Sequence, residues 1–323
     1  MKAVFLDFAT MGSDTLDPAP LTALFPDLSL FDSTPAEMTG ARVQDAELVF
    51  VNKVRITRDI IEASESLRFV GLTATGTDNV DLEAARDRGV AVCNIRAYCT
   101  QSVVEHVFGA LLCLSHSLRS YDASVRRGDW ARADNFCMLG YPIRELSAMT
   151  IGIIGYGELG RSVARMAERF GMRVLVAQRP ETGVNDPILA GDGRVDLDEL
   201  LEAADVISLH CPLTEATRTV IDKAAIRRMK PGAILINTAR GALVDTAALA
   251  QALAEGRIAA AAVDVLPEEP PVSGDPLLDY DGDNLILTPH IAWGTQEARQ
   301  TAIDELAANV EAFLDGEERN RVV

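Results

Sequence analysis

The sequence predicts an α/β chain made of two doubly wound, parallel-sheet domains with a cleft between them. Residues 1 to about 98 alternate short apolar segments with segments of helical spacing, which is typical of a parallel sheet covered by helices. After residue 150, a buried strand leads into a glycine-rich turn, and five further apolar strands follow it. The chain of 323 residues is long enough for two domains of ordinary size.

The first domain is expected to contain five strands, which are Lys2–Asp7, Ser29–Phe31, Leu48–Val51, Phe69–Leu72 and Val90–Cys93. Helical spacing occurs in two segments between them, Thr57–Ser64 and Leu82–Asp87. The next segment, Thr100–Val125, is long and apolar and contains no proline. Its length predicts a single helix, buried on most of its surface, that crosses into the second domain.

In the second domain, predicted strands again alternate with helices. The strands are Ile151–Ile154, Arg173–Ala177, Val206–His210, Ala233–Asn237, Ala259–Val265 and Leu285–Thr288, and the helices include Leu197–Ala203 and Thr246–Glu255. A last helix, Thr295–Leu314, lies beyond this sheet and needs an apolar surface elsewhere. We therefore expect the chain to return to the first domain. That domain would comprise residues 1–98 and 295–323, and residues 99–294 would form the second.

Three glycines in a G-x-G-x-x-G pattern, Gly155, Gly157 and Gly160, follow the first strand of the second domain. Gly155 allows the tight turn, Gly157 lets backbone N–H groups approach a pyrophosphate, and Gly160 lets the helix pack closely on its strand. The helix is expected to open at Gly160, with the positive end of its dipole toward the anion. The strand before the glycines and the amphipathic helix after them predict a dinucleotide site rather than a structural turn.

Composition and charge narrow the classes of partner. The net charge of −18 argues against nucleic acid and anionic membranes, because both would repel the chain. No segment reaches the roughly 18 apolar residues of a membrane span, and the N-terminus, a strand followed by an acid, does not resemble a signal peptide. Five cysteines without a C-x-x-C pair indicate reduced thiols and a cytoplasmic protein. The sequence suggests no metal site.

Polar and charged residues follow three of the predicted strands, where ligands bind in an open α/β sheet. Arg240 follows one strand, the acidic segment Asp264–Pro270 follows the next, and His290 follows the last. A guanidinium can bind a carboxylate and polarise an adjacent carbonyl, and a histidine can transfer a proton near neutral pH. A carboxylate on the other imidazole nitrogen fixes the tautomer. With a nicotinamide nearby, this set suits hydride transfer to a 2-keto acid.

Six blocks of sequence resemble the NAD(P)-dependent D-2-hydroxyacid dehydrogenases. The blocks are Ala74–Asp81, Gly155–Gly160, His210–Leu213, Asn237–Gly241, Asp264–Pro270 and Thr288–Ile291, in the order in which that family has them. The resemblance implies that both domains are Rossmann-like or flavodoxin-like. Residues 99–294 would form the Rossmann domain that binds the coenzyme, and residues 1–98 and 295–323 would form the domain that binds the substrate. It also implies a homodimer formed through the coenzyme domain.

The resemblance assigns roles to individual residues. The implied catalytic residues are Arg240 as the carboxylate and carbonyl anchor, Glu269 as the partner of the histidine, and His290 as the acid/base. The implied substrate-binding residues are Ala74, Thr75, Gly76, Arg240 and Trp293. The cofactor-binding residues are Thr75, Gly155, Gly157, Glu158, Leu159, Gly160, Gln178, Arg179, Pro212, Thr217, Thr238, Ala239, Asp264 and His290.

Two segments of the sequence limit the range of substrates that we expect. The runs Thr288–Gln300 and Phe136–Leu146 look like those of bacterial hydroxypyruvate reductases, also called glycerate dehydrogenases. Trp293 would cover a small pocket and exclude a phosphate, although it could serve only in packing. These features favour reduction of hydroxypyruvate, and of glyoxylate, to D-glycerate and glycolate. A D-lactate-type substrate range and a dinucleotide-sensing binding protein without turnover remain alternatives.

The end of the second strand of the coenzyme domain bears on the choice of cofactor. An acid at this position would bind the ribose 2′-OH and repel a 2′-phosphate. Here the chain has Gln178 and then Arg179, which could pair with a phosphate. The sequence therefore favours NADP(H) over NAD(H), and the alternative is that Arg179 is a solvated loop residue and both cofactors bind.

Overall fold

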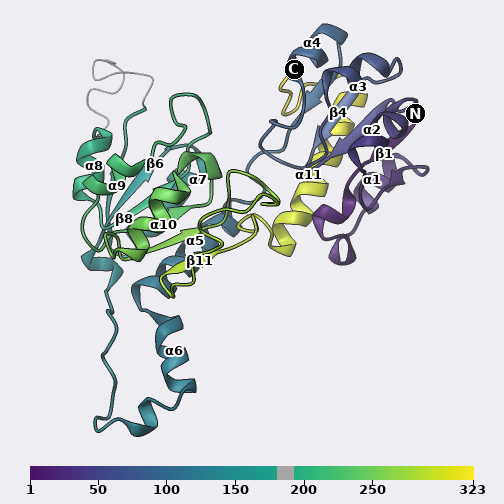
Figure 1. Cartoon of the computed structure of the whole chain (residues 1–323). Coiled ribbons are helices and arrows are strands. Elements are labelled where there is room, and N and C mark those ends of the chain that lie inside the picture. Colours follow the sequence, from purple (N-terminus) through teal and green to yellow (C-terminus); the bar gives the residue numbers. More distant parts are fainter. Residues whose placement is uncertain (180–192) are drawn as a thin grey trace. The chain divides into compact units, whose positions relative to one another are not determined.

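The computed structural model of the chain, shown in Figure 1, describes residues 1–179 and 193–323. The chain divides into two compact units. The first unit consists of Met1–Cys99 and Trp293–Val323, and the second consists of Thr100–Ala292. The first unit is thus built from two separate stretches of the sequence.

The first unit contains a five-stranded, wholly parallel sheet in the order β2-β1-β3-β4-β5. The strands are β1 (Ala3–Phe5), β2 (Ser29–Leu30), β3 (Leu48–Val51), β4 (Phe69–Leu72) and β5 (Ala91–Cys93). All five predicted strands are confirmed, and β1, β2 and β5 are shorter than predicted. The chain order reverses between β1 and β3, which are neighbours, as in other doubly wound sheets.

Both faces of this sheet are buried, because alternate residues of each strand point to opposite sides. Phe5, Phe50 and Phe69 belong to one apolar cluster, while Val49 and Val70 belong to the other. The helices of this unit are α1 (Ala19–Leu24), α2 (Ala36–Val43), α3 (Arg58–Ala63), α4 (Leu82–Arg88) and α11 (Gln296–Leu314). Sequence analysis predicted α3, α4 and α11 but missed α1, which contains Pro20, and α2, which contains Gly40, because both residues disfavour a helix.

Helix α11 supplies apolar residues to the phenylalanine side of the sheet. Ile303, Leu306 and Val310 are fully buried there, in the same cluster as Phe5. The helix begins after Thr295, whose side chain accepts a hydrogen bond from the backbone N–H of Ala298. The expected return of the last helix to the first sheet is therefore what the structure has, and the reason is the apolar surface that this helix must bury.

The second unit contains a six-stranded parallel sheet in the order β11-β10-β9-β8-β6-β7. Its strands are β6 (Thr150–Ile154), β7 (Arg173–Val176), β8 (Val206–Leu209), β9 (Ile234–Asn237), β10 (Ala260–Val263) and β11 (Leu285–Leu287). All six predicted strands are confirmed. The chain order reverses between β6 and β8, so this neighbouring pair marks the position where such sheets bind ligands.

The helices of the second unit are α5 (Thr100–Ser115), α6 (Leu118–Arg126), α7 (Glu158–Arg169), α8 (Leu197–Ala203), α9 (Lys223–Arg228) and α10 (Thr246–Ala254). The prediction of one helix over Thr100–Val125 was wrong. Ser117 adopts a left-handed conformation, with φ +50°, and separates α5 from α6. Its hydroxyl donates to the carbonyl of Pro142, and the N–H of Arg144 donates to the carbonyl of Ser115. These contacts with a distant segment stabilise the break.

Candidate active site

The glycine-rich turn joins β6 to α7. Gly155 has φ +96°, and a Cβ atom on it would lie 2.3 Å from the backbone nitrogen of Cys211. A Cβ atom on Gly160 would lie 2.0 Å from the carbonyl oxygen of Gly155. Both glycines are therefore required by close backbone packing, for the reasons that the sequence suggested. Helix α7 begins at Glu158, two residues before the predicted start, because Gly157 acts as its N-cap.

The turn leaves room for an anionic group. A Cβ atom on Gly157 would meet no atom within 4 Å, so its backbone faces open space. The first N–H groups of any α-helix have no acceptor within the helix, and they lie at its positive end. In α7 these groups belong to Glu158, Leu159 and Gly160. The residues present therefore fit a dinucleotide pyrophosphate.

Three residues implied in cofactor binding, Gln178, Pro212 and Thr217, are held by local hydrogen bonds. The backbone N–H of Gln178 donates to the carbonyl of Val195 at 2.8 Å, just beyond β7. Thr217 is buried, and its hydroxyl donates to the carbonyl of Pro212 at 2.7 Å, which closes the turn after β8. These contacts fix the loops on both sides of β6.

A second arginine lies at the end of β7, besides the exposed Arg179. Residue Val195 pairs with Ala177 as an isolated parallel bridge, which brings Arg194 to the same end of the sheet. The guanidinium carbon of Arg194 lies 5.7 Å from the ring centroid of Tyr156, a residue of the glycine-rich turn. Sequence analysis missed Arg194, because only the pairing of Val195 with Ala177 shows that it is near.

The segment Thr238–Arg240 follows β9 and is held by the buried Asn237. The Asn237 side chain accepts a hydrogen bond from the N–H of Ala239 and donates one to the carbonyl of Arg240. The next residue, Gly241, packs directly on the following loop, since a Cβ atom on it would lie 2.0 Å from the carbonyl carbon of Leu266. The loop of Arg240 therefore contacts the loop that leads to Glu269.

His290 and Glu269 form a direct contact. The Nδ1 atom of the imidazole lies 2.7 Å from Oε2 of Glu269, and the other carboxylate oxygen accepts the N–H of Leu266 at 2.9 Å. Both side chains are partly exposed. Nδ1 is therefore the ring nitrogen that the carboxylate of Glu269 holds, and this contact orients the imidazole.

The backbone around His290 is held by Asp264, whose side chain is only 1% exposed. One carboxylate oxygen of Asp264 accepts the N–H of Ile291 at 2.9 Å, and the other accepts the N–H of Ala292 at 2.8 Å. The N–H of His290 itself donates to the backbone carbonyl of Asp264, and His290 has φ +56°. Sequence analysis implied a cofactor contact for Asp264, and in the structure its carboxylate orders the histidine loop.

The residues expected to bind the substrate carboxylate, Ala74, Thr75 and Gly76, belong to the first unit and follow β4. The hydroxyl of Thr75 donates to the carbonyl of Ile95 at 3.0 Å. The side chain of the buried Asn94 donates to the carbonyl of Thr75 at 2.7 Å. Sequence analysis missed Asn94, because its partner lies on the neighbouring strand connection.

Trp293 also belongs to the first unit, where it packs beside the apolar cluster of α11. Its ring centroid lies 6.3 Å from that of Tyr98, and the ammonium nitrogen of Lys53 lies 5.8 Å from the indole centroid. Lys53 follows β3, and its N–H donates to the buried carboxylate of Asp7 at 2.6 Å. Trp293 therefore lies near side chains from the segments that follow β3 and β5.

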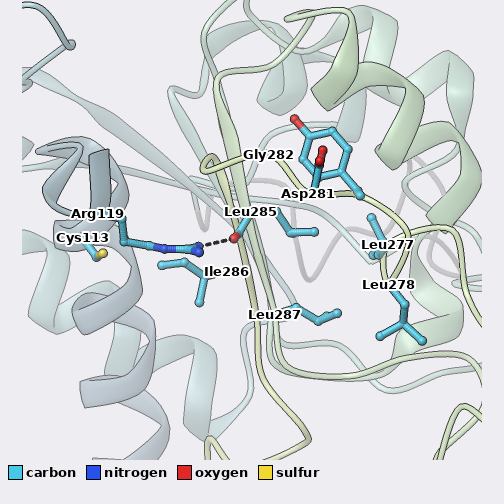
Figure 2. Close-up of a pocket in the computed structure, with 10 residues that line it drawn as sticks. Cys113, Arg119, Leu277, Leu278, Asp281, Gly282, Leu285, Ile286 and Leu287 are labelled. Carbon is cyan, nitrogen blue, oxygen red and sulfur yellow. Dashed lines mark hydrogen bonds between the residues drawn. The ribbon is translucent and has the colours of Figure 1, made fainter. Parts of the chain in front are cut away.

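A separate cavity lies elsewhere in the second unit. It has a volume of about 560 Å³ and lies beside the edge strand β11, lined by apolar residues that include Leu277 and Ile286 (Figure 2). Arg119 from α6 reaches across it to the carbonyl of Leu285. The cavity does not include His290, Glu269 or Arg240. We therefore place the candidate active site at the strand ends and not in this cavity.

The described part of the chain contains no group of three or more histidine, cysteine or acidic side chains able to hold a metal ion. Over the same residues, the structure has no helix with the length and apolar character needed to span a bilayer.

Comparison with known proteins agrees with this geometry. A family model described as D-isomer specific 2-hydroxyacid dehydrogenase, NAD binding domain, matches residues 108–292. The glycerate dehydrogenase of Methylorubrum extorquens is 44% identical over 99% of this chain and 98% of the relative. The hydroxypyruvate reductase of Blautia hydrogenotrophica is 37% identical over 100% and 99%. A solved acyclic imino acid reductase in complex with NADPH and D-Arg is similar in structure, with a TM-score of 0.86, 29% identity and full coverage of both chains.

Proposed function

Because the chain belongs to the D-isomer specific 2-hydroxyacid dehydrogenase family, we propose that it reduces hydroxypyruvate to D-glycerate, and glyoxylate to glycolate, with NADP(H) as the preferred cofactor. Membership makes the chain an oxidoreductase that acts on 2-keto or 2-hydroxy acids through a nicotinamide dinucleotide. The observation that carries the proposed chemistry is the 2.7 Å contact between His290 and Glu269, beside the loop of Arg240.

Reduction of the keto carbon requires one hydride and one proton. The bound reduced nicotinamide supplies the hydride. In our proposal Nε2 of His290 gives the proton to the carbonyl oxygen, while Glu269 stabilises the imidazolium through Nδ1 at 2.7 Å. The guanidinium of Arg240 binds the substrate carboxylate and polarises the carbonyl, which stabilises the negative charge that develops on oxygen.

The same substrate carboxylate would take further hydrogen bonds from the backbone of Ala74–Gly76. Enclosure of the bound substrate would exclude water from the hydride path. Trp293 would limit the size of the pocket, so that a two- or three-carbon keto acid is accepted and a phosphorylated one is not. The relatives named glycerate dehydrogenase and hydroxypyruvate reductase support this substrate class.

The preference for NADP(H) rests on positive charge at the end of β7. Arg179 follows Gln178, where an acid would oppose a 2′-phosphate, and Arg194 lies at the same end of the sheet. Two guanidinium groups are suited to bind a phosphate monoester through charge-assisted hydrogen bonds. The similar reductase that was solved with NADPH supports this choice of cofactor.

Initial rates test the proposal. We expect the highest kcat/KM with hydroxypyruvate and NADPH, a lower value with glyoxylate, and little turnover of phosphohydroxypyruvate. A higher value with pyruvate would contradict the role of Trp293 and favour the D-lactate-type range. No turnover of any 2-keto acid, with intact binding of NADPH, would instead favour the dinucleotide-sensing protein.

We also propose that the protein is a cytoplasmic homodimer that associates through the arm of the second unit, meaning residues 118–145. Figure 1 shows α6 and the following segment extending away from the sheet of this unit. The arm exposes large apolar side chains, including Phe136 at 94% and Leu139 at 75%. The cavity beside β11 (Figure 2), whose lining includes Leu277, Leu278 and Ile286, offers a surface that the arm of a second copy could cover. The odd number of cysteines supports the cytoplasmic location.

A further inference from the structure

The loop to which we assign the substrate carboxylate is attached to the end of β5. The side chain of Asn94 donates from Nδ2 to the carbonyl of Thr75 at 2.7 Å. On either side of this bond, the N–H of Ile95 donates to the carbonyl of Ala74, and the hydroxyl of Thr75 donates to the carbonyl of Ile95. The backbone that would present its N–H groups to a carboxylate is therefore positioned mainly by residues 94 and 95.

The position of the Asn94 side chain leaves one of its polar atoms without a hydrogen bond in the part of the chain that the structure describes. Its side chain is 7% exposed, and its Oδ1 atom is buried without a hydrogen-bond partner among the described residues. A buried acceptor that loses its hydrogen bonds to water destabilises the folded state, so such groups need an explanation. What the amide contributes is the Nδ2 donor, and among the described residues its partner is the carbonyl of Thr75.

A chain of hydrogen bonds connects the backbone of Asn94 to the C-terminal segment. Asn309 of α11 is buried and donates from Nδ2 to the carbonyl of Asn94 at 2.8 Å. Its own Oδ1 accepts from Arg319 at 2.7 Å and from Asn320 at 3.0 Å. The guanidinium of Arg319 is in turn held by both carboxylate oxygens of Glu305, each at 2.9 Å.

The last residues also pair with β5 directly. The N–H of Val322 donates to the carbonyl of Val92 at 2.7 Å, and the N–H of Val92 donates to the carbonyl of Val323 at 3.1 Å. Cys93 and Arg321 form an isolated antiparallel bridge. Strand β5 is thus held by β4 on one edge and by the C-terminal segment on the other.

We propose that Asn94 is a positioning residue for substrate binding, which sets the conformation of the Ala74–Gly76 loop, and that Asn309, Arg319 and the C-terminal segment hold Asn94 in place. The inference rests on the proposed function, because it takes that loop to bind the carboxylate of a 2-keto acid. It adds to that function a dependence of substrate affinity on the last residues of the chain.

The test compares Asn94→Ala with the wild-type enzyme. We expect KM for hydroxypyruvate to rise about tenfold or more while kcat changes less than about threefold, because the loop binds the substrate in the ground state and the transition state alike. KM for NADPH should not change. The melting temperature should change little, because the variant also removes the unpaired acceptor. A fall in melting temperature with unchanged KM for the keto acid would overturn the proposal.

Two further variants separate the positioning role from a general loss of stability. Arg319→Met should raise the same KM by a smaller factor, and in the double variant the two effects should be less than multiplicative, because both act through Asn94. Asn284→Ala is the matched control, since this amide donates to the carbonyl of Ala259 in the second unit at 3.0 Å. It should lower stability without raising KM. Equal KM effects in the control and in Asn94→Ala would overturn the proposal.

Oxamate is a non-reacting analogue of a 2-keto acid, so its Kd measures the affinity of the proposed carboxylate site without turnover. In the presence of NADH or NADPH, we expect the Kd for oxamate to rise in Asn94→Ala by the same factor as KM. Failure of the proposed function would appear as an inactive wild-type enzyme, whereas failure of this inference would appear as equal oxamate affinity in the wild type and the variant. Absence of oxamate binding to the wild type would also overturn it.

Discussion

His290, to which we assign the proton transfer, has an uncommon backbone conformation. Its φ of +56° lies in the left-handed region, which costs a non-glycine residue about 1–2 kcal/mol. The buried carboxylate of Asp264 holds the next two N–H groups, and Glu269 holds the imidazole. Such conformations persist where the surroundings over-determine them, and they occur often at functional sites.

Substitution of the two residues of this pair should have different effects. His290→Gln should lower kcat about 100-fold or more with little change in KM, because proton transfer is lost while the carboxylate contacts remain. Glu269→Gln should lower kcat by a smaller factor, because the imidazole loses the carboxylate that holds Nδ1 at 2.7 Å. Steady-state rates between pH 5 and 9 check both predictions. An unchanged kcat in His290→Gln would remove this residue as the acid.

The two arginines at the end of β7 should determine the cofactor preference. In Arg194→Ala and Arg179→Ala, kcat/KM for NADPH should fall about tenfold for each lost charge-assisted contact, while the value for NADH changes little. Arg228→Ala is a suitable control, because this arginine of the same unit pairs with Asp198. If the ratio of the two cofactors stayed the same in both variants, the 2′-phosphate would not be bound by these residues.

His210 should make stability depend on pH. Burial lowers the pKa of its imidazole from 6.5 to about 4, and the ring lies 2.8 Å from the hydroxyl of Ser208. In the unfolded chain the histidine protonates near pH 6.5, so between about 6.5 and 4 the unfolded state binds more protons. The contribution of His210 to the free energy of unfolding should therefore be constant above this window. Within it, that contribution should fall by up to about 1.4 kcal/mol for each unit by which the pH is lowered.

Urea denaturation at pH 7.5 and pH 5.0 measures this effect. In His210→Gln the part of the pH dependence that comes from this imidazole should vanish, whereas His116→Gln serves as a control. Identical pH slopes in the wild type and His210→Gln would contradict the assignment.

At the scale of elements, the loops after successive strands touch backbone to backbone. Gly155 packs on the backbone of His210 and Cys211 after β8, and Gly241 packs on Leu266 and Pro267 after β10. No side chain can fit at these contacts. The parallel sheet alone brings the strand ends to one edge, but the glycines set how closely the loops that bear the functional residues approach.

Gly241→Ala tests this packing. The added Cβ would lie 2.0 Å from the carbonyl carbon of Leu266, so the loops of Arg240 and Glu269 must separate. We expect the free energy of unfolding to fall by about 1–3 kcal/mol and kcat to fall as well. Gly40→Ala, at a helical position of α2 with no atom within 4 Å, should be neutral or stabilising by up to about 1 kcal/mol. Wild-type kcat in Gly241→Ala would show that the approach of the loops does not matter.

At the scale of the whole molecule, the net charge opposes association of two copies of the chain, whereas the exposed apolar surface favours it. The net charge of −18 opposes association and repels anions, and for this reason our proposal assigns the substrate carboxylate and the cofactor phosphate to the local cations Arg240 and Arg194. The arm of the second unit nevertheless exposes apolar side chains that a monomer would leave in water. We therefore expect this surface to be buried in the interface of a homodimer.

The dimer is tested by the mass in solution. Light scattering on the wild type should give twice 34.8 kDa, and the double substitution of Phe136→Asp and Leu139→Asp should give the single value, because two charges would have to be buried in the interface. Val272→Asp is the control, because Val272 is 84% exposed in the same unit but outside the arm. A wild-type protein of 34.8 kDa at micromolar concentration would rule out the dimer.

The sequence by itself determined every strand of both sheets, the glycine-rich turn and the return of α11 to the first unit. Strands that are buried on both faces appear as short apolar runs, and a dinucleotide turn needs glycines at set spacings. The segments Thr238–Arg240, Asp264–Pro270 and Thr288–Ile291 could be proposed as parts of one site, because the ends of parallel strands meet at one edge of the sheet.

Only the tertiary structure decided where helices break and which polar groups hold the loops. The break at Ser117 depends on Pro142 and Arg144, and the position of the glycine-rich turn depends on the close packing of Gly155 against Cys211, which follows β8. Asn94 meets Thr75 across 19 residues and Asn309 across 215, and nothing in the local sequence of either asparagine indicates its partner. Apolar burial follows from the pattern of each segment, whereas a hydrogen bond between distant segments depends on how the complete fold places both of its atoms.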